Sequence, residues 1–269
     1  MIPKILNYVW LGDRPLPEKD SVFVKGWEKA CPGWEIRHWG LDDLKEIDNV
    51  FVRETIAAGK WVFTCDWLRL YALSKVGGFY LDTDVELRSS LEPFRDNDLC
   101  MGLNRSGWPQ TALIGAVPGH PIVKELLDEY SNRRFILQDG VYDELSSNFV
   151  YHRLFLRHGV DLKKLTQERD VEVMPRVRFY PSSLLCRPDG NKPNVATHHV
   201  FGYWLDPYKR KRVVDLPFGY RLVRMKRRKV ATDSDPLNLL RDERLVGKAL
   251  RFGRVVVAIV KLANRHGKG

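Results

Sequence analysis

Residues 75–87 read KVGGFYLDTDVEL: a glycine pair, a short run of bulky apolar side chains, and then two aspartates one residue apart. The apolar run at 79–81 is typical of a short buried strand. Side chains alternate along a strand, so we expect Asp82 and Asp84 on one face at its exit, with attachment points about 6.6 Å apart. Two carboxylates held in this way repel each other unless a positive charge lies between them.

The segment before the glycine pair is predicted to be a helix. Residues 62–76, VFTCDWLRLYALSKV, contain no Pro or Gly, and their apolar positions 65, 68, 72 and 76 recur at helical spacing. Gly77 then supplies a helix stop. Further out, we expect strands at 5–11, 34–39, 99–103 and 111–117, and helices at 17–30 and 121–130. This alternation predicts an α/β fold.

The size and composition favour one main domain with an appendage. The 269 residues have an average composition, which argues against fibrous, disordered and disulfide-stapled classes. The 4 cysteines are widely spaced and form no CxxC pair, so neither a zinc site nor a disulfide framework is indicated. Residues 1–15 make a poor secretory signal, and no stretch approaches the roughly 18 apolar residues of a membrane-spanning helix. We therefore expect the protein in the cytosol or on a cytosolic surface.

Positive charge is concentrated in the last quarter of the chain. Residues 1–208 carry 26 Lys and Arg against 29 Asp and Glu, whereas residues 209–269 carry 18 against 5. From residue 241 onward, cationic side chains fall on one side of a helical wheel, as in a helix that lies in a membrane interface. We expect a main domain at 1–208 and a basic helical extension at 209–269 that binds an anionic membrane surface. The alternative is an extension that packs on the main domain with its charges solvated.

The carboxylate pair suggests a metal and a diphosphate. In open α/β sheets, ligands bind beyond the carboxyl ends of the strands, where Asp82 and Asp84 are expected. A Mg²⁺ or Mn²⁺ ion bridging them to a nucleotide diphosphate would offset their repulsion, since both ions accept oxygen ligands. For an isolated D-x-D tripeptide, a solvated turn at a strand end is the commoner explanation. Asp66 and Arg69, three apart on the predicted helix, are either a surface ion pair or partners for sugar hydroxyls and phosphate.

Three ordered segments carry a family resemblance. They are IPKILNYVWLGDRPLP at 2–17, TCDWLRLYALSKVGGFYLDTDV at 64–85 and ATHHVFGYW at 196–204. Together they resemble the signature of the DXD-containing sugar-binding-region glycosyltransferases. That family includes the fungal initiating mannosyltransferase, bacterial capsular polysaccharide enzymes and the catalytic domains of the large clostridial toxins. The resemblance covers roughly residues 1–205.

The resemblance implies a GT-A fold, with a Rossmann-like mixed sheet flanked by helices, and a metal-dependent glycosyltransferase that retains anomeric configuration. The implied donor is a nucleotide-diphosphate sugar, with a UDP-sugar favoured over GDP-mannose, and the implied cofactor is Mn²⁺ or Mg²⁺. By matching positions, catalysis is assigned to Asp84, Asp82 and Arg69, donor binding to Val9, Trp10, Asp66, Arg69, Tyr80, Asp82 and Trp204, and metal binding to Asp84, Asp82 and His198.

Within these sets the resemblance gives several residues a particular role. Trp10 would stack on the nucleobase, Tyr80 would line the donor pocket, and Trp204 would close over the diphosphate. Adjacent side chains on a strand point in opposite directions, so at most one of His198 and His199 should face the metal. The match to the family favours His198.

The chain departs from the family pattern in three regions. Tyr203 stands where a serine is expected before the closing tryptophan, and Cys65 stands where many relatives have serine. Where relatives often place an asparagine facing the donor, the candidate substitutes are Asn104, Gln110 and Thr111.

Two other classes of function share some of these features. A nucleic-acid-processing enzyme could combine a metal site with a basic tail, and a non-catalytic nucleotide-sugar or membrane adaptor could carry the same motifs. A nucleic-acid channel should be basic beside its metal, whereas residues 1–208 have a net charge of −3, so we expect no nucleic-acid partner. The preferred interpretation is a hexosyltransferase of capsular or other cell-surface polysaccharide synthesis. Its acceptor would be a glycan or a lipid-linked glycan, and it would be cytoplasmic, peripheral on the inner face of the plasma membrane.

Overall fold

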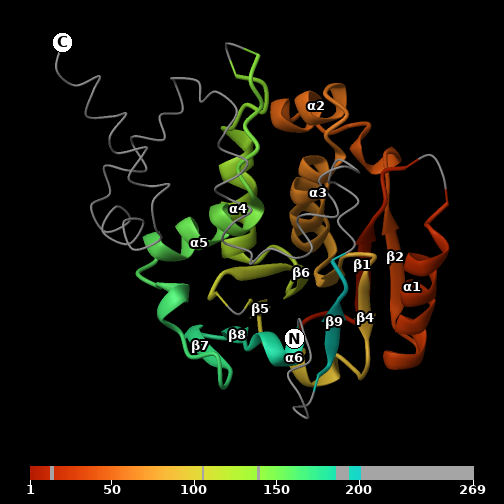
Figure 1. The fold of residues 1–269 in the computed structure, drawn as a ribbon, viewed down its shortest axis with the longest axis vertical. Coiled ribbons are helices and arrows are strands. Elements are labelled where there is room, and N and C mark those ends of the chain that lie inside the picture. The colour runs from red at the N-terminus through yellow and green to blue at the C-terminus, as the bar shows by residue number, and fades with distance from the viewer. Residues whose placement is uncertain (13–14, 105, 138–139, 186–193, 201–269) are drawn as a thin grey trace, which may run out of the picture. The chain divides into compact units, whose positions relative to one another are not determined.

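The computed structural model of the chain describes residues 1–12, 15–104, 106–137, 140–185 and 194–200. Within them a seven-stranded mixed sheet has the strand order β2-β1-β3-β6-β5-β8-β7, and β4 and β9 form a separate antiparallel pair (Figure 1). The strands are β1 (Ile5–Val9), β2 (Glu35–Trp39), β3 (Gly78–Leu81), β4 (Val85–Leu87), β5 (Leu99–Leu103), β6 (Pro109–Ala116), β7 (Val171–Met174), β8 (Val177–Tyr180) and β9 (Ala196–His198).

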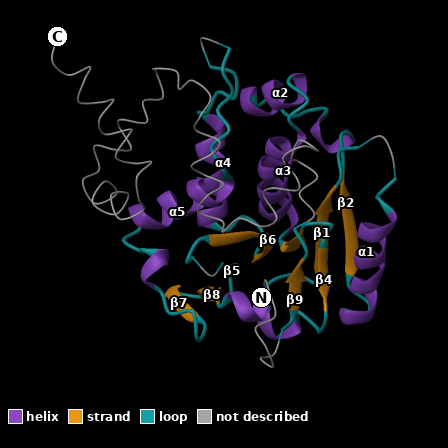
Figure 2. Cartoon of the chain, in the orientation of Figure 1, coloured by secondary structure: helices purple, strands orange, loops and turns teal. Residues whose placement is uncertain are grey.

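Helices flank the sheet (Figure 2). They are α1 (Glu18–Ala30), α2 (Val50–Ala57), α3 (Trp61–Val76), α4 (Pro121–Ser131), α5 (Ser147–Arg157) and α6 (Ser182–Leu185), with 3₁₀ turns at Asp42–Leu44, Glu92–Phe94 and Leu162–Lys164. On β3, Phe79 and Leu81 share a core cluster with Trp27 of α1. The ring of Tyr80, between them in sequence, instead faces the guanidinium of Arg69 on α3. Since successive strand side chains point to opposite faces, α1 and α3 cover opposite faces of the sheet.

The glycine pair lets α3 end and β3 begin without a connecting loop. Gly77 has a φ of +66° and Gly78 a φ of +90°, which side chains other than glycine rarely adopt. A Cβ at Gly77 would lie 2.7 Å from the ring of Pro118, and one at Gly78 would lie 2.5 Å from the carbonyl oxygen of Ile5. The absence of side chains here lets β3 pair in parallel with β1, so both strands end at the same edge of the sheet.

The predicted α/β class is confirmed, and each strand and helix expected between residues 5 and 130 forms close to its expected bounds. The larger unit of the chain comprises Met1–Phe135 and continues from Asp143, while Ile136–Tyr142 belongs to a second unit and forms a bridge between its own ends. The predicted basic extension at 209–269 lies outside the described residues, so the domain boundary at 208 stays a prediction. No described helix combines the length and apolar character needed to cross a membrane.

Candidate active site

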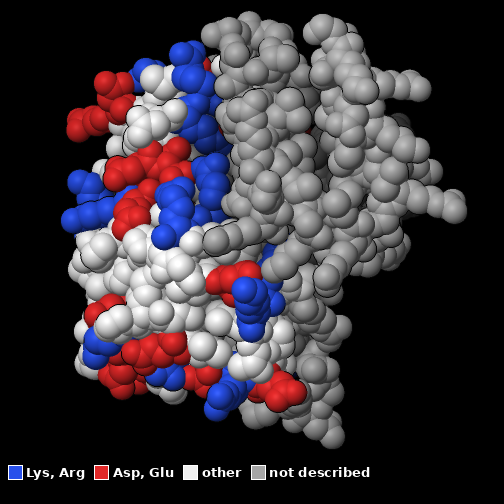
Figure 3. Space-filling model, turned by 90° about the vertical axis from the view of Figure 1, so that its left-hand side faces the viewer, with Lys and Arg blue, Asp and Glu red and all other residues white. Residues whose placement is uncertain are grey.

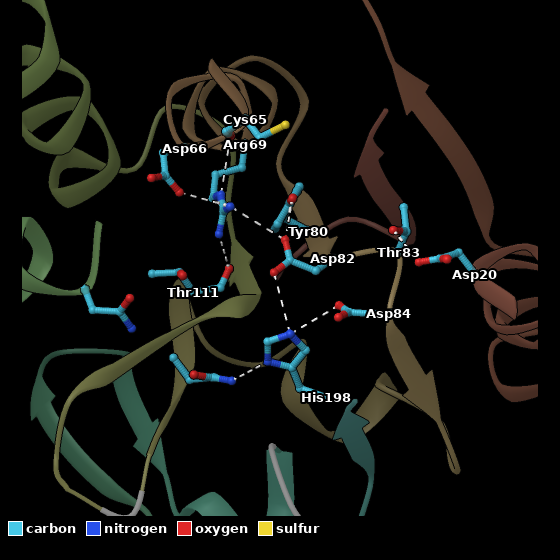
Figure 4. Close-up of polar contacts among 12 residues, drawn as sticks. Asp20, Cys65, Asp66, Arg69, Tyr80, Asp82, Thr83, Asp84, Thr111 and His198 are labelled. Carbon is cyan, nitrogen blue, oxygen red and sulfur yellow. Dashed lines mark hydrogen bonds and ion pairs between the residues drawn. The ribbon is translucent and has the colours of Figure 1, made fainter. Parts of the chain in front are cut away.

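The two aspartates lie in a turn and not on a strand. β3 ends at Leu81 and β4 begins at Val85, and the backbone N–H of Val85 donates to the carbonyl oxygen of Asp82 at 3.0 Å. The expectation that both carboxylates project from one strand face was therefore wrong, because the chain reverses between β3 and β4. The turn is fixed from α1, where Asp20 Oδ1 accepts from the Thr83 hydroxyl at 3.0 Å (Figure 4).

The turn nevertheless brings both carboxylates to one histidine. His198 Nε2 lies 3.1 Å from Asp84 Oδ1 and 4.0 Å from Asp82 Oδ2, and one ligand atom from each residue falls within 4.8 Å of the others (Figure 4). His198 is the last residue of β9, which pairs with β4 and places His198 opposite Val85. Two carboxylate oxygens and an imidazole nitrogen suit a divalent cation such as Mn²⁺. The residues present therefore fit the predicted metal.

His199 faces away from this cluster, as the alternation along a strand predicts. Its ring stacks on Phe23 of α1 with centroids 4.6 Å apart, and its Nε2 lies 3.0 Å from Glu86 Oε2. Its backbone N–H donates to the carbonyl oxygen of Asp84 at 3.0 Å, which ties β9 to the turn. The structure thus separates the two histidines, and only His198 is placed beside the aspartates.

Arg69 connects α3 to the turn. Its guanidinium lies 3.0 Å from Asp66 Oδ1 and 3.6 Å from Asp82 Oδ1, and it donates to the backbone carbonyl of Thr111 at 2.8 Å (Figure 4). Arg69 is 4% exposed and Asp66 6%. Of the two interpretations left open by the sequence, the surface ion pair is excluded, because the pair is buried with its face toward the end of β3.

Burial controls the protonation of this group. It raises the pKa of Asp66, and the Arg69 guanidinium and the Ser147 hydroxyl oppose that rise by stabilising the carboxylate. Burial would lower the pKa of Arg69, but Tyr80, Asp82 and Asp66 hold it well above its ordinary value. Arg69 is therefore a permanent positive charge beside the aspartates.

Tyr80 orients the Asp82 carboxylate. Its hydroxyl donates to Asp82 Oδ1 at 2.6 Å, and its ring lies 4.8 Å from the Arg69 guanidinium carbon. Burial raises the pKa of Tyr80 well above the ordinary value, so the phenol keeps the proton that it donates. The resemblance had Tyr80 lining the donor pocket; the structure leaves it 2% exposed and gives it contacts that orient Asp82.

β1 ends at Val9, at the same edge of the sheet as the aspartates, and Trp10 follows it. Asn7 lies level with Tyr80 in the parallel pairing, so Val9 is level with Asp82. Val9 is 5% exposed, whereas Trp10 is partly buried and its carbonyl oxygen lies 3.0 Å from a ring nitrogen of His38. Trp10 thus follows the strand that runs beside β3, which places it next to the turn in the fold.

The three candidate substitutes for the family asparagine have different surroundings. Asn104 Oδ1 accepts from the backbone N–H groups of Ser106 and Trp108 and so holds the β5–β6 turn. Thr111 offers its carbonyl oxygen to Arg69, and Gln110 Nε2 lies 2.8 Å from His198 Nδ1. Gln110 is thus the candidate that reaches the metal-ligand cluster. Trp204 and Tyr203 lie outside the described residues.

Some residues that shape the site were not anticipated. Asp20 is fully buried and anchors the turn through Thr83, and the Trp27 indole N–H donates to the carbonyl oxygen of Val85 at 2.8 Å. Ser147, at the start of α5, stabilises the Asp66 carboxylate. The sequence could have indicated Asp20 only as an aspartate on the buried side of a predicted helix. No feature of the sequence indicates the role of Ser147.

A pocket of about 330 Å³ lies elsewhere on α3, lined by Arg37, Trp39, Asp43, Tyr71, Lys75 and Val76. A helix turns about 100° per residue, so Tyr71 faces about 200° away from Arg69. This pocket is therefore separate from the cluster of aspartates and His198.

An α/β sheet whose strands end in a carboxylate–histidine cluster beside a buried arginine defines a class of protein that can bind a metal and a diphosphate. Comparison with known families is more specific. Residues 17–101 match the family described as "Glycosyltransferase sugar-binding region containing DXD motif", so this part of the chain is similar to the sugar-binding region of the DXD glycosyltransferases. The resemblance inferred from the three motifs is confirmed.

A curated relative agrees with this class. "Inositol phosphoceramide mannosyltransferase 1" of Schizosaccharomyces pombe is 25% identical over 224 residues, which cover 75% of this chain and 61% of the relative. The chain therefore spans less than two thirds of the length of that protein.

Two solved structures overlap the fold in part. "PaToxG Glycosyltransferase" has a TM-score of 0.47 at 18% identity, over 58% of this chain and 70% of that one. A glycosyltransferase involved in the glycosylation of the major capsid of PBCV-1 has a TM-score of 0.42 at 12% identity, over 80% of this chain and 100% of that one. Structural overlaps of this extent add no evidence about the family or the function of the chain.

Proposed function

We propose that this protein is a metal-dependent glycosyltransferase of GT-A type that moves a hexose from a nucleotide-diphosphate sugar to a glycan or lipid-linked acceptor. The observation that carries the proposal is the convergence of Asp82, Asp84 and His198 within 4.8 Å, in a chain whose segment 17–101 matches the DXD family. A lone D-x-D turn would not need a histidine from a strand more than a hundred residues later.

The chain's own residues divide the work of binding the donor. Asp82, Asp84 and His198 would hold a Mn²⁺ or Mg²⁺ ion, which when bound would neutralise charge on the departing diphosphate. Arg69 adds a fixed positive charge 3.6 Å from Asp82, suited to a phosphate or a sugar hydroxyl. Asp66 can accept a hydrogen bond from a sugar hydroxyl, and Trp10 can stack on the nucleobase, a contact of about 1–3 kcal/mol.

We favour a front-side route to retention. The acceptor oxygen would bond to the anomeric carbon on the face from which the phosphate oxygen leaves, and the acceptor proton would pass to that oxygen. The described carboxylates of the site are already engaged: Asp66 with Arg69, Asp82 with Tyr80, and Asp84 with His198. A carboxylate that would serve as a covalent nucleophile would have to give up such a partner.

The donor base and the acceptor are the finer parts of the proposal. The motifs favour a UDP-sugar, while the name of the fungal relative, a mannosyltransferase acting on inositol phosphoceramide, supports a mannose donor such as GDP-mannose and a lipid-linked acceptor. A panel of UDP-glucose, UDP-galactose and GDP-mannose separates these donors. Release of nucleotide from one of them above the others identifies the base and the sugar.

We also propose that the enzyme is cytoplasmic, acts on cell-surface or capsular polysaccharide and binds the inner face of the plasma membrane through residues 209–269. The support is the excess of 18 Lys and Arg over 5 Asp and Glu in that segment. Removing residues 241–269 should release the protein from anionic liposomes without loss of donor hydrolysis. Retained liposome binding would contradict the proposal.

Nucleic-acid processing is the less favoured function. On the face drawn in Figure 3, described Lys and Arg side chains are interspersed with Asp and Glu. Among the described ion pairs, Glu129 of α4 pairs with both Arg153 and Arg157 of α5. Charges neutralised in this way cannot contribute fully to binding a phosphate backbone.

The experiment that tests the function is hydrolysis of the donor panel by the full chain, with and without Mn²⁺. Asp84→Asn should abolish metal-stimulated release of nucleotide and leave the circular dichroism spectrum unchanged, while Asp96→Asn, at an exposed position outside the site, should behave as wild type. Trp10→Ala should weaken nucleotide binding. Full turnover by Asp84→Asn would remove the metal assignment, and wild-type protein that releases nucleotide from none of the donors would contradict the function itself.

A further inference from the structure

Gln110 is the polar side chain behind His198, on the side away from the aspartates. Its Nε2 lies 2.8 Å from His198 Nδ1, while His198 Nε2 lies 3.1 Å from Asp84 Oδ1. Asp84 and Gln110 therefore contact the two nitrogens of one ring. In addition to the proposed metal-dependent function, on which this inference rests, we propose that Gln110 is a positioning residue that holds the His198 ring and pairs with its Nδ1 in both the metal-free and the metal-bound form.

The argument follows from the two forms of neutral imidazole. One nitrogen carries a proton and donates, and the other presents a lone pair. To bind a cation, His198 must present the lone pair of Nε2 and carry its proton on Nδ1, so the partner of Nδ1 must accept a hydrogen bond. With Nε2 donating to the Asp84 carboxylate instead, the partner of Nδ1 must donate.

A carboxamide is the side chain that satisfies both forms. It carries a carbonyl oxygen and an amino group at one end, so a half-turn about its last bond replaces the donor by the acceptor. A carboxylate at position 110 could only accept and would hold His198 in the metal-binding form. A thioether of the same length could do neither well.

The backbone of Gln110 is held from both sides, which fixes where its amide can reach. The carbonyl oxygen of Pro109 accepts from the Asn148 side chain, and the carbonyl oxygen of Thr111 accepts from Arg69 at 2.8 Å. Gln110 itself is 7% exposed, so water is largely excluded as a replacement partner for His198 Nδ1. Removing the amide would take away this contact at Nδ1, so the ring would be oriented from the Nε2 side alone, by Asp84 or by the metal.

Metal affinity gives the first test. Gln110→Met keeps the length of the side chain without its hydrogen bonds, and it should weaken Mn²⁺ binding by about 10- to 100-fold in calorimetric titration, the usual effect of removing such a partner. Gln110→Glu should bind Mn²⁺ at least as tightly as wild type. Gln167→Met makes the same change on a glutamine outside the site, which contacts the carbonyl oxygen of Leu165, and should have no effect.

The protons on His198 give a second test that a merely space-filling glutamine would not pass. In ¹⁵N NMR spectra of metal-free protein, at a pH where the wild-type ring is neutral with its proton on Nε2, His198 in Gln110→Glu should carry protons on both nitrogens, because a carboxylate then faces each of them. His198→Ala identifies those signals by their loss. The same protonation of His198 in both proteins, or wild-type Mn²⁺ affinity in Gln110→Met, would overturn the role of Gln110 while leaving the metal site intact. Wild-type protein that binds no Mn²⁺ would overturn the inference together with the proposed function.

Discussion

Replacing Arg69 with lysine should destabilise the fold and weaken donor binding, while the metal ligands stay in place. The guanidinium reaches Asp66, Asp82 and the carbonyl oxygen of Thr111 at 3.0, 3.6 and 2.8 Å. An ammonium has no planar fork, so lysine can keep its charge near Asp66 but cannot reach the other two groups. At 4% exposure, water cannot readily take the place of the guanidinium there.

The magnitude follows from the hydrogen bonds and the ion pair that a lysine cannot make. A buried hydrogen bond to a carbonyl contributes about 1 kcal/mol and one between charged groups about 1.5–3 kcal/mol, so Arg69→Lys should cost about 3 kcal/mol of unfolding free energy. For a domain of roughly 200 residues, this lowers the melting temperature by about 6–12 °C. Arg69→Met, which leaves Asp66 buried without its partner, should cost more, about 3–5 kcal/mol.

The assay combines urea unfolding with two titrations. Arg69→Lys should unfold at lower urea. It should bind Mn²⁺ like wild type, because the Tyr80 hydroxyl still orients Asp82. It should bind the nucleotide sugar at least about tenfold more weakly, which corresponds to about 1.4 kcal/mol. A wild-type unfolding midpoint would refute the contacts assigned to the guanidinium. A wild-type donor affinity would refute its place in the donor site.

Three further changes test other parts of the structure. Tyr80→Phe removes the hydroxyl that donates to Asp82 Oδ1 at 2.6 Å, so Mn²⁺ affinity should fall by about tenfold in calorimetry. An unchanged affinity would show that the hydroxyl does not orient the Asp82 carboxylate. Gly78→Ala would put a Cβ 2.5 Å from the carbonyl oxygen of Ile5, so it should lower the free energy of unfolding by more than about 2 kcal/mol in urea. Gly26→Ala, whose Cβ would have nothing within 4 Å, should not lower it. Equal stabilities of the two variants would contradict the close approach of β3 to β1. Burial raises the pKa of Cys100 to about 12, so its thiol stays protonated until the pH nears that value. At pH of about 8 the thiolate fraction is about 10⁻⁴, against about a quarter for an ordinary thiol. Peptide mapping should therefore find iodoacetamide at least about a thousandfold slower at Cys100 than after unfolding, a difference whose absence would contradict its burial.

The strands and helices around the turn could be predicted because local signals mark their ends. α3 ends at Gly77, where φ is positive, and the apolar run after the glycine pair forms β3 as expected. The alternation along β9 correctly separated His198 from His199. These features depend on residues close together in the sequence, where backbone preference and side-chain alternation decide the structure.

The geometry of the site could not be predicted in the same way. The turn that carries Asp82 and Asp84 is tied through Thr83 to Asp20 on α1, 63 residues earlier in the chain. The contact between Gln110 and His198 joins residues 88 apart and depends on how β9 pairs with β4. Strand registers of this kind are set by tertiary packing, so a motif names the ligands but not their partners.

The measurement that tests the central claim most directly is anomalous diffraction at the manganese edge from crystals of the full chain soaked with Mn²⁺ and a nucleoside diphosphate. We expect an anomalous peak within bonding distance of Asp82, Asp84 and His198, with diphosphate oxygens beside it and Arg69 close to the phosphates. A manganese ion bound elsewhere, or a diphosphate bound away from this turn, would contradict the account.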